Sequence, residues 1–320
     1  MSTFKFPSTK FKPLKIKKKE QMIEQFAYLI HVKFTDIECK YFNNFISASK
    51  CIKIVKGKYD NGRVMRAEEI EIILTDVDFN FICKAYNFKS YEFIEIYYSV
   101  YDYLPIDFVN FVLEKYKLKT KYKDVDGMES VYAIEKSKFN ALYGMSVTNN
   151  IKSDVIFENE SGWREEKIDN DTILEKLEKE EKEGFLSFSY GVWICAIARN
   201  NLLENLIKLD KNMIYADTDS LKLFGNYDKM VIEDYNKSVL ERIQKVCTER
   251  KIDINKFKPK DVKGKERWLG IFDNDGNYSE FITQGAKKYA YRDKEDNEIH
   301  ITVSGVPKKR SKSIKRFTRF

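Results

Sequence analysis

Two short apolar runs enclose a pair of aspartates in the second half of the chain, and this pattern predicts a β-hairpin. Met-Ile-Tyr at 213–215 precedes the pair, and Leu-Lys-Leu-Phe at 221–224 follows it. Asp217 and Asp219 are two residues apart, so their carboxylates would share one face of a strand or converge at the tip of a tight turn. Mg²⁺ prefers such oxygen ligands and completes its coordination with water and substrate phosphates. The segment therefore predicts either a metal-binding hairpin tip or an ordinary turn, because Asp-Thr-Asp-Ser also favours turns.

A second segment, residues 136–144, has helical character and places chemically useful side chains on one face. Positions i, i+4, i+7 and i+8 of a helix lie close together. In this segment they hold Lys136, Asn140, Tyr143 and Gly144. An ammonium, an amide and an aromatic ring suit a triphosphate, a sugar or phosphate, and a base, and a glycine leaves room for a close approach. The alternative is an amphipathic helix with a solvated lysine, a core that includes Phe139 and Leu142, and a glycine cap.

Together, in this order and roughly seventy residues apart, the two segments resemble motifs B and C of family B DNA polymerases. Motif B has the pattern Lys-x3-Asn-x2-Tyr-Gly, and motif C has the pattern Tyr-x-Asp-Thr-Asp-Ser. Gly-Ala-Lys-Lys-Tyr at 285–289 follows where the family places its Lys-x-Tyr motif. The resemblance implies an α+β fold built on the family's palm, an antiparallel sheet with helices, together with fingers helices, two insertions and a partial thumb.

The resemblance is strongest to the protein-primed branch of the family, which occurs in phages and linear plasmids. Residues 73–79, Ile-Leu-Thr-Asp-Val-Asp-Phe, resemble the stretch before a helix in that branch's first terminal-protein-region insertion. The charged stretch 151–184 occupies the place of the second insertion, which in the family is linked to strand displacement and processivity. Tyr-Gly-Val-Trp at 190–193, running on to Ala-Arg at 198–199, resembles the palm helix that leads back toward motif C.

The resemblance implies template-directed DNA synthesis by two-metal nucleotidyl transfer, in which a primer 3′-hydroxyl attacks the α-phosphate of a deoxynucleoside triphosphate. Two Mg²⁺ ions are the implied cofactors, with Mn²⁺ as the alternative. Asp219 would bridge both ions, and Asp217 would be a weaker or outer ligand. Lys136 would neutralise or protonate the departing pyrophosphate. These three are the implied catalytic residues.

The same resemblance implies contacts with nucleotide and DNA. Lys136 and Asn140 would grip the triphosphate, and Tyr143 would pack on the nascent base pair. Gly144 would leave space beside that base pair, and Lys123 lies where the family keeps a further basic residue toward the triphosphate. The implied DNA contacts are Lys287 and Tyr289, which would touch the primer, together with Arg199, Tyr215 and Thr218. Primer–template DNA and deoxynucleoside triphosphates are therefore the implied partners, and a terminal protein is a further one.

Motif A, the Asp-x2-Ser-Leu-Tyr-Pro strand that supplies another metal-binding aspartate, is missing from the sequence. Asp36, Asp76 and Asp78 lie in strand-like surroundings upstream of motif B, but none precedes a Tyr-Pro step, so we expect turn or surface residues. No exonuclease segment precedes them. We therefore expect the carboxyl-terminal part of a polymerase, from just after motif A into the thumb. It could be a truncated reading frame, an expressed fragment, or half of a split enzyme with a separate amino-terminal part.

Functions other than polymerisation remain open. Without motif A, the chain could be a catalytically inactive fragment that binds DNA and nucleotide. A reverse transcriptase fits less well, because its corresponding hairpin carries two adjacent aspartates, whereas Thr218 separates them here. A metal-dependent phosphatase or nuclease lacks support from histidine, since His31 and His300 lie far from every motif and we expect both at the surface.

The landmarks divide the chain into predicted parts. These are 1–27, a palm remnant and basic linker; 28–118, the first insertion; 119–150, the fingers; 151–185, the second insertion; 186–285, the palm; and 286–320, the start of a thumb. Hydrophobic patterning predicts strands at 27–34, 47–55, 69–74 and 93–100, and helices at 78–86 and 105–116. It also predicts helices at 190–207 and 228–250, and strands near Trp268 and Lys287. The run at 175–183, dense in Glu and Lys, predicts either an exposed, salt-bridged helix or a mobile segment.

Composition is consistent with a folded nucleic-acid-binding protein. Of the 320 residues, 43% are hydrophobic, which suffices for a sizeable core. The net charge of +7 gathers in basic stretches such as 256–267 and 308–319, although solvated lysine faces would explain most of these. Five scattered cysteines without Cys-x2-Cys spacing argue against a zinc site and disulfides. With no membrane-spanning apolar run and no secretory signal, we expect no membrane partner and a cytoplasmic location, in the host cell if the chain is viral.

Overall fold

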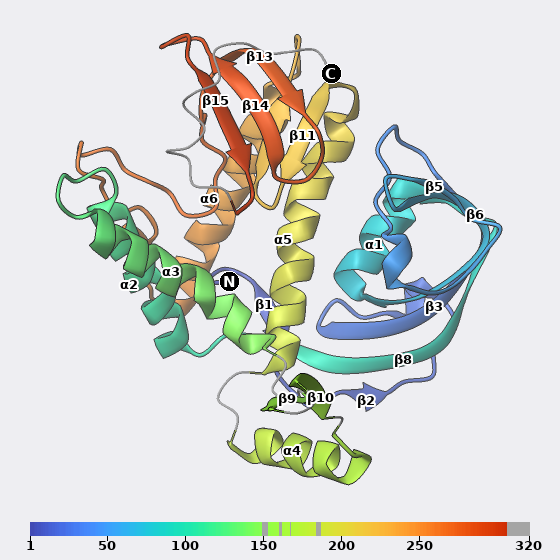
Figure 1. Ribbon diagram of the computed structural model, residues 1–320. Coiled ribbons are helices and arrows are strands. Elements are labelled where there is room, and N and C mark those ends of the chain that lie inside the picture. Colours follow the sequence, from blue (N-terminus) through green and yellow to red (C-terminus); the bar gives the residue numbers. More distant parts are fainter. Residues whose placement is uncertain (149–152, 160–161, 167, 184–186, 306–320) are drawn as a thin grey trace. The chain divides into compact units, whose positions relative to one another are not determined.

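The computed structural model describes residues 1–148, 153–159, 162–166, 168–183 and 187–305 (Figure 1). These residues form two compact units. The first comprises Met1–Lys40, Asn44–Asn200 and Arg242–Leu269, and the second comprises Tyr41–Asn43, Asn201–Glu241 and the chain from Gly270 onward. The long helices α5 (Phe188–Lys208) and α6 (Met230–Arg250) contribute residues to both units.

A large antiparallel sheet forms the core of the first unit. Its central path runs β1-β8-β3-β6-β4, with β2 paired to β8, β7 to β3 and β5 to β6. The strands are β1 (Lys5–Pro7), β2 (Lys12–Pro13), β3 (Phe26–Cys39), β4 (Cys51–Val55), β5 (Lys58–Asp60), β6 (Arg63–Thr75), β7 (Tyr86–Asn87) and β8 (Ser90–Tyr103). Alternation along β3 makes one face apolar, because Ile30, Val32 and Phe34 are buried while the residues between them are partly exposed.

Helix α1 (Asp76–Ala85) lies within the curve of this sheet and closes its core (Figure 1). Phe79 is fully buried there, and its ring stacks against Phe34 of β3 with centroids 6.0 Å apart. Thr75 caps the helix: its hydroxyl accepts from the Asp78 N–H at 3.1 Å and donates to the Asp78 carboxylate at 2.9 Å. The cap explains why the helix starts two residues earlier than hydrophobic patterning predicts.

Asp76 is a buried carboxylate, so its prediction as a turn or surface residue is wrong. It is 9% exposed and accepts hydrogen bonds from the Tyr101 hydroxyl at 2.7 Å and the Trp193 indole N–H at 3.1 Å. The Tyr28 amide also donates to it, at 3.4 Å. Donors from β8, α5 and β3 therefore converge on one residue and satisfy a group whose burial would otherwise be costly. Asp36, in contrast, is exposed as predicted.

Helices α2 (Ile106–Tyr122) and α3 (Glu129–Ser146) form an antiparallel helical hairpin in the first unit. Val109, Val112 and Leu113 are the buried apolar residues of α2. The charged segment that follows contains the hairpin β9 (Asp154–Glu158) and β10 (Gly162–Glu166) and then α4 (Asn170–Glu183). Of the two alternatives for 175–183, the helix is therefore confirmed, as the C-terminal part of α4.

The second unit contains two small antiparallel sheets. One is the hairpin β11 (Met213–Asp217) and β12 (Ser220–Leu223), and the other comprises β13 (Tyr278–Thr283), β14 (Lys288–Asp293) and β15 (Ile299–Val303). Tyr215 joins them, because its ring packs against Phe281 and Tyr289 with centroids 6.1 and 5.1 Å away. Four 3₁₀ turns complete the described elements of the chain: Lys19–Gln21, Ala48–Lys50, Asp210–Asn212 and Ile254–Phe257.

Most of the predicted helices and strands are confirmed, with three corrections. Trp268 lies outside any strand, the predicted strand at 47–55 begins with a 3₁₀ turn at Ala48–Lys50, and Gly144 lies inside α3 instead of capping it. Residues 306–320 of the predicted thumb, and parts of the predicted second insertion, lie outside the described residues. None of the helices in the described part of the chain combines the length and apolar character that crossing a membrane requires.

The burial of Asp76 predicts a specific pH dependence of stability. Burial raises the pKa of Asp76 to about 6, so between pH 4 and 6 the folded chain keeps a proton that the unfolded chain releases. The free energy of unfolding should therefore fall with rising pH across this window, by about 3 kcal/mol for this group. Denaturant unfolding at several pH values should show that Asp76→Asn loses this component while the exposed control Asp36→Asn keeps it. Equal pH slopes in the wild type and Asp76→Asn would contradict the assignment.

Candidate functional site

The hairpin β11–β12 places its two aspartates in different environments. Asp217 is the last residue of β11 and pairs with Ser220, so the loop contains only Thr218 and Asp219. The Asp219 amide donates to the Asp217 carbonyl at 2.6 Å, and Thr218 between them has a positive φ of 54°. This bond spans two residues, as in a γ-turn, and a positive φ is unfavourable for a β-branched residue. The prediction of a tight hairpin with both carboxylates at its tip is confirmed.

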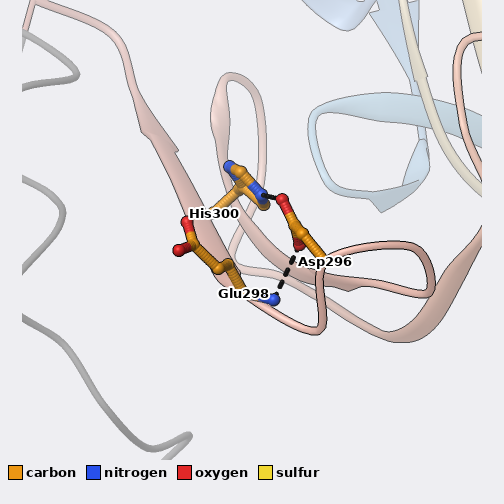
Figure 2. A group of neighbouring side chains, drawn as sticks. All are labelled: Asp296, Glu298 and His300. Carbon is orange, nitrogen blue, oxygen red and sulfur yellow. Dashed lines mark hydrogen bonds and ion pairs between the residues drawn. The ribbon is translucent and has the colours of Figure 1, made fainter.

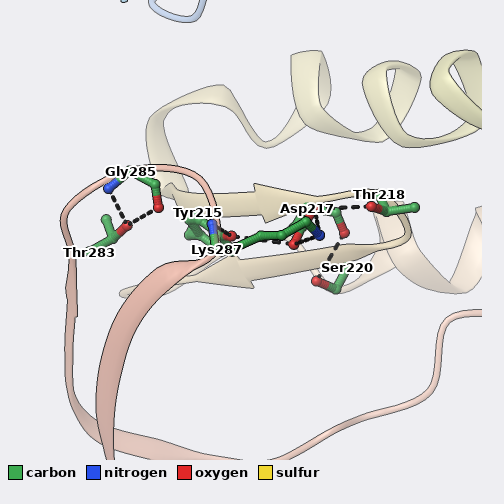
Figure 3. A network of polar contacts seen from close by, with 7 residues as sticks. All are labelled: Tyr215, Asp217, Thr218, Ser220, Thr283, Gly285 and Lys287. Carbon is green, nitrogen blue, oxygen red and sulfur yellow. Dashed lines mark hydrogen bonds and ion pairs between the residues drawn. The ribbon is translucent and has the colours of Figure 1, made fainter. Parts of the chain in front are cut away.

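Asp217 is held by a network of donors (Figure 3). The Lys287 ammonium donates to both carboxylate oxygens, at 3.0 and 2.8 Å, and the Thr218 hydroxyl donates to one of them at 2.9 Å. The Tyr215 hydroxyl lies 3.4 Å from the other oxygen and accepts from the Lys287 backbone N–H at 2.8 Å. Ser220 donates to the Asp217 carbonyl at 3.3 Å. The carboxylate is therefore well supplied with hydrogen bonds before any ligand arrives.

The pairing of Asp217 with Lys287 shifts the proton affinity of both groups. The hydrogen bond from Lys287 lowers the pKa of Asp217, and the reciprocal bond raises the pKa of Lys287. Asp219 adds a smaller electrostatic contribution to the raised pKa of Lys287. Lys287 itself lies in the turn before β14 with a positive φ of 56°, so its backbone occupies a conformation that lysine rarely adopts. Because the pKa of Asp217 is lowered and that of Lys287 is raised, both side chains stay charged at neutral pH.

Asp219 is exposed and lies in the turn, close enough to Lys287 to influence it. Within the described ranges of the chain, no hydrogen bond or ion pair engages its carboxylate. A hard divalent cation takes such oxygen ligands, and Mg²⁺ needs only one or two of them when phosphates supply the rest. The donor set at the hairpin tip therefore fits a metal ion, with Asp219 as the available ligand and Asp217 already occupied.

The ring of Tyr215 belongs to the core of the second unit. Tyr215 is 8% exposed and packs against aromatic residues of the adjacent sheet. Its hydroxyl connects the backbone of Lys287 to the Asp217 carboxylate. Tyr289 and Thr218 differ in exposure, since Tyr289 is partly buried and Thr218 is exposed. DNA contacts by these three residues stay predictions.

Helix α3 presents the predicted nucleotide-binding face. Lys136 and Asn140 are exposed, and the Lys136 ammonium lies 5.7 Å from the Tyr132 ring centre. Gly144 lies within the helix, and a Cβ built there would meet no atom of the described residues within 4 Å. Packing inside the chain therefore does not require this glycine, although it weakens the helix. The side chain of Tyr143 lies outside the described part of the structure.

Two further predicted contacts have defined positions. Lys123 follows the last residue of α2 and is exposed. The Arg199 guanidinium of α5 donates to both carboxylate oxygens of Asp78, at 3.0 and 2.9 Å. Asp78 is thus a half-buried ion-pair partner and helix-start residue, which corrects its assignment as a simple surface aspartate. A bidentate pair of this kind orients Arg199 strongly.

One other group in the described ranges has the composition of a metal site. Asp296 and Glu298, in the turn between β14 and β15, and His300, in β15, place ligand atoms within 4.8 Å of one another (Figure 2). The Asp296 carboxylate already accepts from the Glu298 amide at 2.7 Å and lies 3.3 Å from the His300 ring nitrogen. His300 also stacks on Tyr291 with centroids 5.0 Å apart, so it is only partly exposed. These contacts account for the turn without an ion.

The histidine predictions need a correction. His31 is only partly exposed, because its ring lies 2.7 Å from the Glu71 carboxylate on the neighbouring strand. His300 is held between Tyr291 and Asp296. Both expected surface residues are therefore only partly exposed and have side-chain partners, and both remain distant in sequence from motifs B and C.

The pairing of Asp217 with Lys287 was not predicted from the sequence. The family resemblance implies primer contact for Lys287, and for Asp217 a catalytic role as a weaker or outer metal ligand. The available signal was chemical: a lysine of the Lys-x-Tyr segment and an acid of the hairpin carry opposite charges, and a tyrosine hydroxyl at 215 can bridge them. Seventy residues separate Asp217 from Lys287, so only the fold brings them together.

The chain matches no protein-family model, and no curated protein matches it by sequence. Solved structures do match. Phi29 DNA polymerase complexed with primer-template DNA and incoming nucleotide substrates has a TM-score of 0.62 at 18% identity, over 97% of this chain and 49% of that one. Its complex with primer-template DNA has a TM-score of 0.61 at 17% identity, over 97% and 49%. Its complex with single-stranded DNA has a TM-score of 0.59 at 16% identity, over 97% and 48%.

These matches concern the fold. The chain spans about half the length of phi29 DNA polymerase. The prediction of an α+β fold resembling a protein-primed family B DNA polymerase is confirmed at this level. Which part of that polymerase each segment corresponds to stays a prediction, as do the boundaries of palm, fingers, insertions and thumb.

Proposed function

We propose that this chain is part of a template-directed DNA polymerase that transfers deoxynucleotides to a primer 3′-hydroxyl. The observation that carries the proposal is the difference in contacts between the two aspartates of the hairpin β11–β12. Asp217 is fully engaged by Lys287, Thr218 and Tyr215, whereas Asp219 projects an available carboxylate from the turn. The fold shared with phi29 DNA polymerase and the order of the sequence motifs support the same activity.

Asp219 is the proposed ligand of the divalent ion, and Asp217 is proposed to act by holding Lys287. When bound, Mg²⁺ or Mn²⁺ would supply charge neutralisation and polarisation at the reacting phosphate. Because Lys287 balances the charge of Asp217, the Asp217 and Asp219 carboxylates can lie close together in the short turn without strong mutual repulsion. With Asp217 paired to Lys287, only Asp219 is available as a ligand here. Binding two metal ions would therefore require another carboxylate from outside these residues.

We propose that the exposed face of α3 binds the incoming nucleotide. Lys136 and Asn140 would contact the triphosphate, and Lys136 would neutralise or protonate the departing pyrophosphate. Lys123 is an exposed ammonium that would add to the attraction. Packing within the described chain does not require a glycine at 144, so we propose that Gly144 allows the nucleotide or DNA to approach the helix closely. Tyr143 would pack on the nascent base pair.

DNA would contact residues of the second unit and of α5. Lys287 and Tyr289 are proposed primer contacts, and Thr218 is exposed at the hairpin tip. Tyr215 would act through its hydroxyl, because its ring is buried. Arg199 would have to bind a phosphate while it keeps its bond to Asp78, or exchange one for the other. A terminal protein would be the natural primer-bearing partner for a polymerase of the protein-primed type.

A second candidate is a binding fragment without catalytic activity. The sequence contains no motif A aspartate, and the chain spans about half of phi29 DNA polymerase. The loss of one metal-binding carboxylate should cost several orders of magnitude in rate. Activity would then require a further polypeptide segment that carries motif A, either in a longer form of the protein or on a separate amino-terminal chain.

Primer extension separates these candidates. On a short primed template with Mg²⁺ and four deoxynucleotides, we expect extension when the chain is supplemented with an amino-terminal polymerase part that carries motif A. Asp219→Asn should reduce the rate about 1000-fold or more, because it removes the metal ligand. Asp217→Asn and Lys287→Met should each cause a smaller loss of about tenfold to a hundredfold. Their double variant should be no worse than either alone, since both break one interaction.

The exposed Asp234→Asn on α6 is the matched control and should retain full activity. Full extension by Asp219→Asn would remove the proposed ligand. DNA binding without extension under every condition would favour the inactive fragment.

Gly144→Ala should separate stability from function. Within the helix, alanine is more stable than glycine by roughly 0.5 to 1 kcal/mol, and the added methyl meets no described atom of the chain. The free energy of unfolding should therefore rise. Affinity for primer–template or nucleotide should fall about fivefold or more, because the methyl would occupy the space that the ligand approaches. Unchanged affinity in a stabilised variant would show that no ligand approaches this position.

A further inference from the structure

Glu135 is a buried carboxylate in the seam between α2 and α3, directly before Lys136. It is 8% exposed, although it lies on a helix whose other charged residues are exposed. One carboxylate oxygen accepts from the Lys138 ammonium at 2.8 Å. The other oxygen lies 3.8 Å from the Lys115 ammonium of α2 and makes no hydrogen bond. Such a group is tolerated because two cations offset the cost of its burial.

The seam around Glu135 has a defined composition. One helical turn further along α3, Phe139 packs against Tyr116 of α2 with ring centroids 5.8 Å apart. The Lys119 ammonium lies 4.9 Å from the centre of the same Phe139 ring. Glu135 and Phe139 are four residues apart, so they form one stripe of α3 that faces α2. Lys115 is only 14% exposed, and besides Glu135 its ammonium has only the exposed Glu114 carboxylate, 4.0 Å away, at ion-pair distance among the described residues.

This arrangement determines which lysines on the helical hairpin remain available to an anion. Lys138 and Lys115 are bound to Glu135, and the hydrogen bond from Lys138 lowers the pKa of that carboxyl. Lys136 has no carboxylate at ion-pair distance in the part of the chain that the structure describes. Successive residues of a helix differ by about 100°, so anchoring Glu135 toward α2 turns Lys136 to an open face. Asn140 follows on that same face.

We propose that Glu135 is a positioning residue for nucleotide binding. It fixes the rotation of α3 against α2 and thereby the direction of Lys136 and Asn140, an inference that rests on the proposed nucleotide-binding function of that face. If Glu135 acted only through its charge, its removal would have the opposite effect on nucleotide affinity. Removal of a negative charge from the neighbourhood of Lys136 should strengthen the binding of a triphosphate, whereas loss of positioning should weaken it. The sign of the effect therefore distinguishes the two roles.

The test measures nucleotide and DNA affinity separately in Glu135→Gln. With a fluorescent dATP analogue and Mg²⁺, and with tripolyphosphate as competitor, we expect both ligands to bind about tenfold more weakly than to the wild type. Affinity for a labelled primer–template should stay within about twofold, because a general loss of structure would lower both affinities. Glu114→Gln is the matched control, since Glu114 is exposed and lies 4.0 Å from the same Lys115 ammonium. It should leave both affinities unchanged.

Amide hydrogen exchange of residues 129–146 tests the effect of Glu135 on α3 in the absence of nucleotide. The amides of α3 should exchange faster in Glu135→Gln than in the wild type or Glu114→Gln, because the seam loses its ionic contact. A wild-type chain that binds no nucleotide would overturn the proposed function, and faster exchange would still support the orienting role of Glu135. Unchanged exchange would overturn the inference, as would equal or tighter nucleotide binding by Glu135→Gln.

Discussion

The ion pair between Asp217 and Lys287 is the interaction on which the candidate site depends. It connects the hairpin β11–β12 to the turn before β14, and Tyr215 strengthens the connection through its buried ring and its hydroxyl. An exposed ion pair contributes little to stability by itself. Its importance here is geometric, because it holds one carboxylate of a two-residue turn and leaves the neighbouring carboxylate available. Two aspartates that are nearly equivalent in sequence thereby acquire different properties.

Much of the fold could be predicted from the sequence because its signals are local. The apolar runs around Asp217 and Asp219 predicted the hairpin, and the stretch 136–144 predicted a helix, whose role in nucleotide binding stays a prediction. Alternation along β3 and β8 predicted two of the long strands, although the structure extends both. Turn and helix chemistry act over a few residues, so short patterns carry this information.

The remaining features depend on contacts between distant residues, which local patterns do not contain. Asp76 is buried because Tyr28, Tyr101 and Trp193 supply donors from three other elements. Trp268 has an apolar aromatic side chain typical of a strand, yet its stretch is fixed by individual contacts such as the Arg267 amide donating to Pro259. Glu135 looks like any exposed helix glutamate until α2 brings Lys115 beside it. In each case the position or conformation of the residue is explained only by contacts with residues that are distant in the sequence.

A crystal structure of the chain with Mn²⁺ and a deoxynucleoside triphosphate would show which aspartate binds the metal, because anomalous scattering locates the ion independently of the protein density. We expect an anomalous peak within about 2.5 Å of an Asp219 carboxylate oxygen, with the Lys287 ammonium still bound to Asp217. A peak coordinated by Asp217, with Lys287 displaced and Asp219 directed away, would contradict the division of roles between the two aspartates.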